Sequence, residues 1–260
     1  MPRRYFLPAL ALTVLAGLPA LAQTALKDPQ AVVLTSKAVS ALDGTTTLTD
    51  VSVQATVAHT AGSDFETGTA SLEGHVGNEA RIVLNLSGGQ RQEVRNGPAG
   101  NWSGSDGQVH SMATHNCWTD PTWFFPGLSL QSALNDSQVA IAYVGQENRN
   151  GTTVYHLQLS RVIPGQSPDT TAAIQQLSAV DFYLDGASYL PVALGFNVHP
   201  DDDLNLSIPV EIQFSDYRLV NGVRAPFHLQ KLIQYGLTLD INVSGLLVNL
   251  GLPQTEFAVQ

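Results

Sequence analysis

The 260-residue sequence contains a single cysteine, Cys117, and few charged residues. One cysteine cannot form an internal disulfide, so the fold must hold together without one. Charged residues make up 13% of the chain, well below the roughly 25% usual in soluble domains. Acidic residues outnumber basic ones, 22 against 12, and the net charge of −10 argues against nucleic acid as a partner and against electrostatic docking on anionic lipid.

Long apolar runs are also absent beyond the first 22 residues, so we expect no integral membrane protein. Residues 1–22 place Arg3 and Arg4 before an apolar stretch that ends in Ala20-Leu21-Ala22. This arrangement is typical of a secretory signal peptide with an A-x-A cleavage site. We expect cleavage after Ala22, a periplasmic or secreted location, and no lipid anchor, because the residue directly after that site is Gln23 and not a cysteine. Residues 23–260 should then form a single domain.

The spacing of apolar residues changes near residue 48 from one typical of a helix to one typical of strands. Asp28-Pro29 followed by apolar positions up to Gly44 predicts one amphipathic helix with an N-cap, a first-turn proline and a C-terminal glycine. Ser167-Pro168 predicts a second helix that ends near Leu177. From Val51 onward apolar and polar residues alternate, which predicts strands with one buried face.

Turn residues separate these alternating runs at regular intervals, which favours long antiparallel hairpins. The turns are Gly62-Ser63-Asp64, Gly88-Gly89, Asp106-Gly107, Asn150-Gly151, Asp185-Gly186 and Asn221-Gly222. The sequence therefore predicts a mainly β (α+β) fold, a large curved antiparallel sheet with a few short helices. Because so few helices cover the apolar face, the sheet should curl around a concave apolar surface, where small hydrophobic ligands bind in such folds.

Three stretches resemble the LolA/LolB-like periplasmic lipoprotein carriers and lipoprotein-sorting proteins. They are Gly68–Gly74 (GTASLEG), Val109-His110 after the Ser105-Asp106-Gly107 turn, and Val210–Arg218 followed by Asn221-Gly222-Val223 and Pro226-Phe227. The last block is the most specific of the three. The resemblance implies an unclosed antiparallel half-barrel whose helices lie over a hydrophobic cavity that receives acyl chains.

The stretch HNCWTDPTWFFPGLSL, residues 115–130, gathers the cysteine, a histidine and two of the three tryptophans. His110, His115 and Cys117 are residue types that bind zinc or copper, but their spacing matches no known metal motif. His115 could also activate Cys117 as a nucleophile, although the aromatic neighbours predict a buried, inert thiol. We therefore expect no metal, no cofactor and no catalytic group here.

The aromatic part of this stretch is interrupted by prolines, which prevents one regular element from burying all of it. Asp120-Pro121 should start a turn of helix that Pro126-Gly127 ends. An irregular, aromatic segment of this kind is typical of a cover over a cavity mouth. The candidate ligand-binding residues are Trp118, Trp123, Phe124, Phe125, Leu128 and Leu130.

The function predicted from these features is an exported, non-enzymatic protein that binds a hydrophobic small molecule or acyl chain, including that of a lipoprotein. The alternative is a structural or protein-interaction module of the cell envelope whose interior is filled by its own side chains. A continuous apolar cavity favours ligand binding, whereas a packed interior favours the module.

Overall fold

The computed structural model describes residues 26–260, so the expected signal peptide, residues 1–22, lies outside the described residues. Within that range the chain forms one thirteen-stranded sheet in which all neighbouring strands run antiparallel, in the order β6-β5-β4-β3-β2-β1-β13-β12-β11-β10-β9-β8-β7. The strands are β1 (Asp50–Ala61), β2 (Asp64–His75), β3 (Glu79–Leu86), β4 (Gly89–Asn96), β5 (Ala99–Ser103), β6 (Val109–Ser111), β7 (Val139–Arg149), β8 (Thr152–Arg161), β9 (Val180–Asp185), β10 (Pro191–Val198), β11 (Ile208–Val220), β12 (Val223–Ile233) and β13 (Gly236–Val248).

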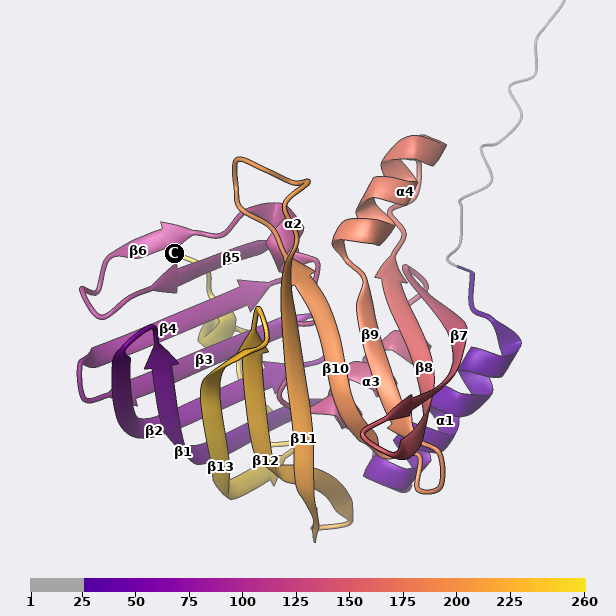
Figure 1. The fold of residues 1–260 in the computed structure, drawn as a ribbon, viewed down its shortest axis with the longest axis horizontal. Coiled ribbons are helices and arrows are strands. Elements are labelled where there is room, and N and C mark those ends of the chain that lie inside the picture. The colour runs from indigo at the N-terminus through magenta and orange to yellow at the C-terminus, as the bar shows by residue number, and fades with distance from the viewer. Residues whose placement is uncertain (1–25) are drawn as a thin grey trace, which may run out of the picture.

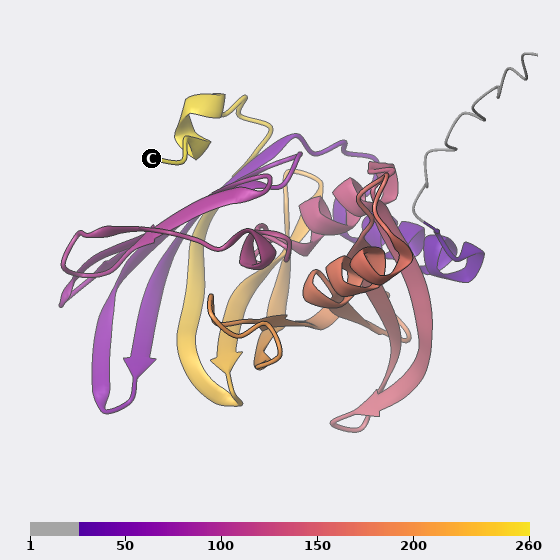
Figure 2. The ribbon, with the colours of Figure 1, turned by 90° about the horizontal axis from the view of Figure 1, so that it is seen from above.

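The sheet is strongly bent and does not close (Figures 1 and 2). Seen from above, it forms a U whose two arms carry β1–β6 and β7–β9 (Figure 2). The strands β6 and β7 lie at opposite edges of the sheet, and β1 pairs with β13 near its middle. The expected mainly β fold with an unclosed, curved antiparallel sheet is therefore confirmed.

Alternation along the strands decides which face is buried. In β1, Val51, Val53, Ala55 and Val57 are at most 4% exposed, whereas Gln54 between them is exposed. The apolar positions of the neighbouring strands continue this buried row across the inside of the U, in one hydrophobic cluster. Burial of this face supplies most of the favourable free energy of folding, at about 25 cal/mol per Å² of apolar surface.

Turn chemistry sets the register of the hairpins. Both residues of Asn150-Gly151 have positive φ, 51° and 84°, and so have both residues of Asn221-Gly222, 51° and 87°. Two-residue loops with positive φ at both positions match the twist of the flanking strands, which is why Asn-Gly is preferred there. The other expected turns also separate consecutive strands.

The helices are α1 (Pro29–Asp43), α2 (Thr114–Cys117), α3 (Pro126–Asn135), α4 (Pro168–Leu177) and the 3₁₀ helix η1 (Gln254–Phe257). Two of them were expected and are confirmed. Asp28 caps α1 by accepting hydrogen bonds from the backbone N–H groups of Gln30 and Ala31, at 2.7 and 3.0 Å, and Ser167 caps α4. Within residues 26–260 no helix combines the length and the apolar character that crossing a bilayer requires.

The expected role of Pro126 is wrong. Residues 121–124 form a hydrogen-bonded turn, and Pro126 begins α3 instead of ending a preceding helix. A proline is well suited to the first position of a helix, because its missing N–H would have no partner within the helix anyway. The residues that follow it, Gly127 to Asn135, then continue as regular helix.

The helices are distributed unevenly around the sheet. Figure 2 shows α2, α3 and α4 between the two arms of the U, with η1 outside the arm that carries β3 and β4. Helix α1 packs against α3, and Arg224 of β12 donates a hydrogen bond to the Ala41 carbonyl of α1 at 3.2 Å. The concave face is therefore covered by α1, α3 and the chain between β6 and α3.

Candidate functional site

The chain between β6 and β7 crosses the concave face of the sheet, and we call residues 114–135 the covering segment. It comprises α2, the turn at residues 121–124 and α3. A Cβ atom added at Gly74 of β2 would lie 2.8 Å from Thr122 Cγ2 and 3.4 Å from Leu128 Cδ2. Glycine at this position thus lets the covering segment lie directly on the sheet.

Five of the six predicted ligand-binding residues are almost completely buried in the hydrophobic cluster. Trp123 is 1% exposed, Phe124 and Phe125 are 2% exposed, and Leu128 and Leu130 are fully buried. The ring planes of Trp123 and Phe124 meet edge to face, with centroids 5.8 Å apart. These five side chains attach the covering segment to the core.

The sixth residue, Trp118, is half-buried and lines a cavity of about 290 Å³ beside the covering segment. The cavity lies between the β2–β3 turn, the loop at residues 118–122, α3 and the adjoining ends of β8 and β9. Its apolar lining includes Val76, Trp118, Val139, Leu159, Val180 and Phe182. Its polar lining includes Thr119, Asp120, Thr122, Ser129, Asp136 and Arg161. The predicted ligand contacts of the other five residues remain a prediction.

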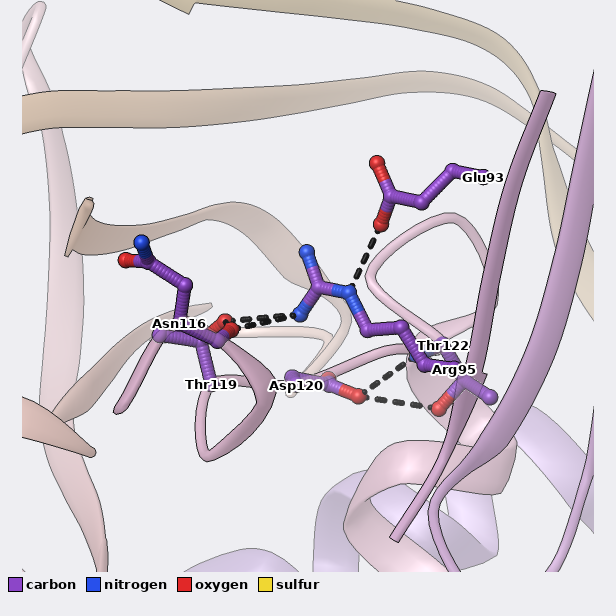
Figure 3. Close-up of polar contacts among 6 residues, drawn as sticks. All are labelled: Glu93, Arg95, Asn116, Thr119, Asp120 and Thr122. Carbon is purple, nitrogen blue, oxygen red and sulfur yellow. Dashed lines mark hydrogen bonds and ion pairs between the residues drawn. The ribbon is translucent and has the colours of Figure 1, made fainter. Parts of the chain in front are cut away.

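Several hydrogen bonds hold the N-terminal part of the covering segment, in addition to the buried Cys117 (Figure 3). Arg95 of β4, which is 5% exposed, donates from Nη1 to Thr119 Oγ1 at 2.8 Å and to the Asn116 carbonyl at 3.2 Å. Its Nε donates to Glu93 Oε1 at 2.7 Å. Burial raises the pKa of Glu93, but the charges of Arg95 and Lys231 outweigh burial, so that this pKa lies below its usual value.

A pair of hydrogen bonds joins α2 to the loop between β10 and β11. The Asn116 side chain donates to the His199 carbonyl at 2.8 Å and accepts from the His199 N–H at 3.0 Å. The two hydrogen bonds resemble the pairing of neighbouring strands, and they add a second connection between α2 and the sheet to the one made by Arg95. Helix α2 itself has only four residues and no side-chain N-cap.

Helix α3 is fixed more firmly. The Gln131 side-chain amide donates to the Leu48 carbonyl at 2.9 Å and accepts from the Leu48 N–H at 3.3 Å. At the C-terminal end of α3, Lys27 Nζ donates to the carbonyl oxygens of Ala133 and Leu134, at 2.9 and 2.7 Å. A cation at this position stabilises the negative end of the helix dipole.

Asp120 begins the turn that leads into α3. Its Oδ1 atom accepts from both the N–H and the hydroxyl of Thr122, each at 2.9 Å. The other oxygen, Oδ2, is buried, and no hydrogen-bond partner for it lies within residues 26–260. Burial raises the pKa of Asp120 although the hydrogen bonds from Ser129 and Thr122 oppose that shift.

A second buried carboxyl, Asp43, lies where α1 ends and α3 begins. It is fully buried, and neither oxygen has a hydrogen-bond partner in the described part of the chain. A Cβ atom added at Gly127, the second residue of α3, would overlap Asp43 Oδ1. Burial raises the pKa of Asp43 from 3.8 to about 7.

The three residues considered as metal ligands lie in different surroundings. His110 stacks on Trp102 with ring centroids 4.4 Å apart, whereas the His115 ring faces that of His199 at 6.2 Å. Cys117 is 1% exposed, which confirms its expected burial, and burial raises the pKa of its thiol. Across residues 26–260 no group of three or more His, Cys, Asp or Glu side chains is arranged so that it could hold a metal ion.

Sequence analysis missed a hydrogen-bonded chain of Ser215, His228 and Asp240, one residue on each of three adjacent strands. Ser215 Oγ lies 2.9 Å from His228 Nδ1, and His228 Nε2 lies 3.1 Å from Asp240 Oδ1. Ser215 is exposed, and the side chains of the other two are about 30% exposed. Because Ser215 and His228 are direct cross-strand partners, we interpret this chain as a stabilising ladder on the sheet.

No model of a protein family matches this sequence, and no curated protein sequence matches it either. Several solved structures, however, are similar to the structure of this chain. They include a LolA superfamily protein from Nitrosomonas europaea (9% identity, TM-score 0.54, covering 88% of this chain and 97% of that one). A DUF1329 family protein from Desulfovibrio piger is also similar (14%, 0.51, 89% and 98%). A third is a domain described as an outer membrane lipoprotein-sorting protein domain, from Vibrio parahaemolyticus (12%, 0.50, 88% and 96%). The chain therefore has a LolA-like fold.

Proposed function

We propose that this protein is an exported, non-enzymatic binder of a hydrophobic ligand, an acyl chain or the acyl group of a lipoprotein, in the periplasm or outside the cell. The cavity of about 290 Å³ beside the covering segment carries this proposal, because apolar side chains form much of its wall. The structural similarity to a lipoprotein-sorting domain supports it. The ligand would lie between the covering segment and the ends of β8 and β9.

The two halves of the covering segment differ in how strongly they are attached. Trp123 and Phe125 are at most 2% exposed, and truncating a buried aromatic side chain costs about 3–5 kcal/mol. Hydrogen bonds hold residues 114–122, and each contributes only about 0.5–1.5 kcal/mol net, or up to about 3 kcal/mol with a charged partner. Residues 114–122 would therefore open for ligand entry while α3 stays in place.

In this proposal Arg95 is the main residue that holds residues 114–122 in place beside the cavity. Replacing Arg95 with alanine removes both hydrogen bonds to the covering segment and the hydrogen-bonded cation of Glu93, for which only the charge of Lys231 then remains. We expect faster release of a bound probe from Arg95→Ala than from the parent protein, measured by stopped-flow dilution. Arg81→Ala is the matched control, because the ion pairs of Arg81 within residues 26–260 join it to Glu73 and Glu256, at 3.5 and 3.6 Å, and not to the covering segment. Equal release rates would show that Arg95 does not hold the cavity closed.

The binding itself is tested with N-phenyl-1-naphthylamine, an uncharged probe that fluoresces in apolar surroundings. The parent protein should bind it, and Trp118→Ala should weaken binding by about tenfold or more, about 1.4 kcal/mol, because an aromatic part of the cavity wall is lost. Trp102→Ala is the control, since Trp102 lies on β5 and is 45% exposed. A parent protein that binds neither this probe nor acyl chains would contradict the proposal.

The envelope interaction module remains the second candidate, and one observation favours it. Much of the concave face is filled by the protein's own side chains, including Trp123, Phe124 and Phe125. A module of this kind would keep its fold and stability when no probe binds. The same titration therefore separates the two functions.

A further inference from the structure

The polar lining of the cavity includes an arginine that forms no ion pair within the described residues. Arg161, the last residue of β8, lines the cavity and is half-buried. Its backbone N–H donates to Ser178 Oγ at 2.8 Å, and its Nε donates to the Trp118 carbonyl at 3.3 Å. Within residues 26–260, no protein acceptor satisfies its two terminal nitrogens, and no carboxylate lies within 4.0 Å of them.

The nearby carboxylates do not replace such a partner. Asp120 and Asp136 act on Arg161 only through their charges, without a hydrogen bond. Asp120 Oδ1 is occupied by Thr122, and its Oδ2 is buried away from solvent. Burial lowers the pKa of Arg161, and the two carboxylates oppose this effect. A half-buried guanidinium has lost part of its hydration, and a ligand that brought a hydrogen-bonded anion would offset part of this cost.

The apolar part of the cavity wall determines which group of the ligand can lie beside Arg161. Leu159 lies on β8 with Arg161, Val180 and Phe182 lie on the neighbouring strand β9, and all three line the same cavity. About 290 Å³ lies at the lower end of the roughly 300–1,000 Å³ common for ligand pockets. This space suits one alkyl chain, not several acyl chains side by side.

We propose that the cavity binds a single-chain amphiphile whose carboxylate pairs with the terminal nitrogens of Arg161 while its alkyl chain lies against Leu159, Val180 and Phe182. The inference rests on the proposed function and specifies the chemical class of its ligand. A carboxylate is favoured because its two oxygens match the two terminal nitrogens of a guanidinium, which gives paired, charge-assisted hydrogen bonds. An uncharged or cationic head would leave these nitrogens without an anion.

The test uses three ligands with the same ten-carbon chain, namely decanoate, 1-decanol and decylamine, which compete with N-phenyl-1-naphthylamine for the full-length exported protein. We expect decanoate to bind at least tenfold more tightly than 1-decanol, and decylamine to bind most weakly. Arg161→Gln should remove the preference for decanoate and leave 1-decanol binding unchanged. Arg161→Lys, which keeps the charge but loses the paired geometry, should retain part of the preference.

Arg149→Gln is the matched control, because Arg149 pairs with Glu211 at 2.7 Å and lines a different pocket. It should leave the order of the three ligands unchanged, and thermal melts should show folded protein for each variant. Equal affinity of the parent protein for decanoate and 1-decanol would overturn the inference while the proposed function stands, and this comparison needs no variant. Failure of the probe and of all three ligands to bind would instead overturn the proposed function.

Discussion

Asp43 should make the stability of this protein fall as the pH rises from about 4 to about 7. Its carboxyl group is fully buried between α1 and α3 and has no hydrogen-bond partner among the described residues. Burial disfavours the charged form and raises the pKa from 3.8 to about 7. A group whose pKa is raised on folding stabilises the folded state below its unfolded pKa, and this contribution is lost as the pH passes the folded pKa.

The size of this loss of stability follows from the pKa shift of Asp43. A difference of about three pKa units corresponds to about 4 kcal/mol between pH 4 and pH 8. The nearby N-terminus of α3 favours the carboxylate by up to about 1 kcal/mol, which reduces the expected loss to about 3 kcal/mol. This is a substantial part of the 5–15 kcal/mol by which domains are usually stable, so the effect should be measurable.

The assay is urea unfolding of the parent protein and of Asp43→Asn at several values between pH 4.5 and 8.5. An amide cannot ionise, so the variant should lose the Asp43 contribution and become the more stable protein above about pH 7. At pH 4.5 it should be less stable than, or equal to, the parent. Asp202→Asn, a change at an exposed loop carboxyl, should leave the pH profile unchanged. Parallel profiles for the parent and Asp43→Asn would refute the reasoning.

Three further changes test other parts of the structure. Cys117→Ser should cost about 1–2 kcal/mol of stability, because a hydroxyl replaces a buried thiol. A thiol reagent at neutral pH should label native Cys117 only slowly, and rapid labelling would contradict its burial. Replacing both Phe124 and Phe125 with alanine should lower the melting temperature strongly, since both are 2% exposed, whereas an unchanged melt would show that they only cover the cavity. A fluorophosphonate probe should leave Ser215 unlabelled, and stoichiometric labelling would show that the chain with His228 and Asp240 activates a nucleophile.

Local signals in the sequence were enough to predict the sheet and two helices. The alternation of apolar and polar residues in β1, the Asn-Gly turns and the helix caps each depend on residues that are close together in the sequence. The caps are Asp28 and Ser167. These signals do not depend on where the rest of the chain lies. Pro126 shows their limit, because a proline is compatible both with ending one helix and with starting the next.

The polar part of the candidate site could not be predicted in the same way. Glu93 and Arg95 lie in β4, where polar residues occupy both faces, so that the strand resembles one exposed to solvent. Their inward direction becomes evident only when β4 is paired with β3 and the covering segment lies across it. Arg161 and Asp120 are likewise 41 positions apart in sequence and meet only at the cavity.

The aromatic cluster was recognised from its composition, but its burial was not. The prolines in residues 118–130 indicated an irregular segment, and the structure contains one that lies over the concave face. Whether a side chain faces a cavity or the core depends on the opposing surface, which composition does not describe. Trp118 faces the cavity, whereas Trp123 is buried in the core.

The most direct test of ligand binding is native mass spectrometry of the protein produced with residues 1–22, the proposed signal peptide, and purified without detergent from the envelope of a bacterial host. We expect a population that carries one amphiphile per protein molecule, with the bound mass released on gentle activation and identified as a single-chain carboxylate. Arg161→Gln should reduce that population. Protein of bare mass alone, both as purified and after incubation with decanoate, would contradict the central claim that this cavity holds a hydrophobic ligand.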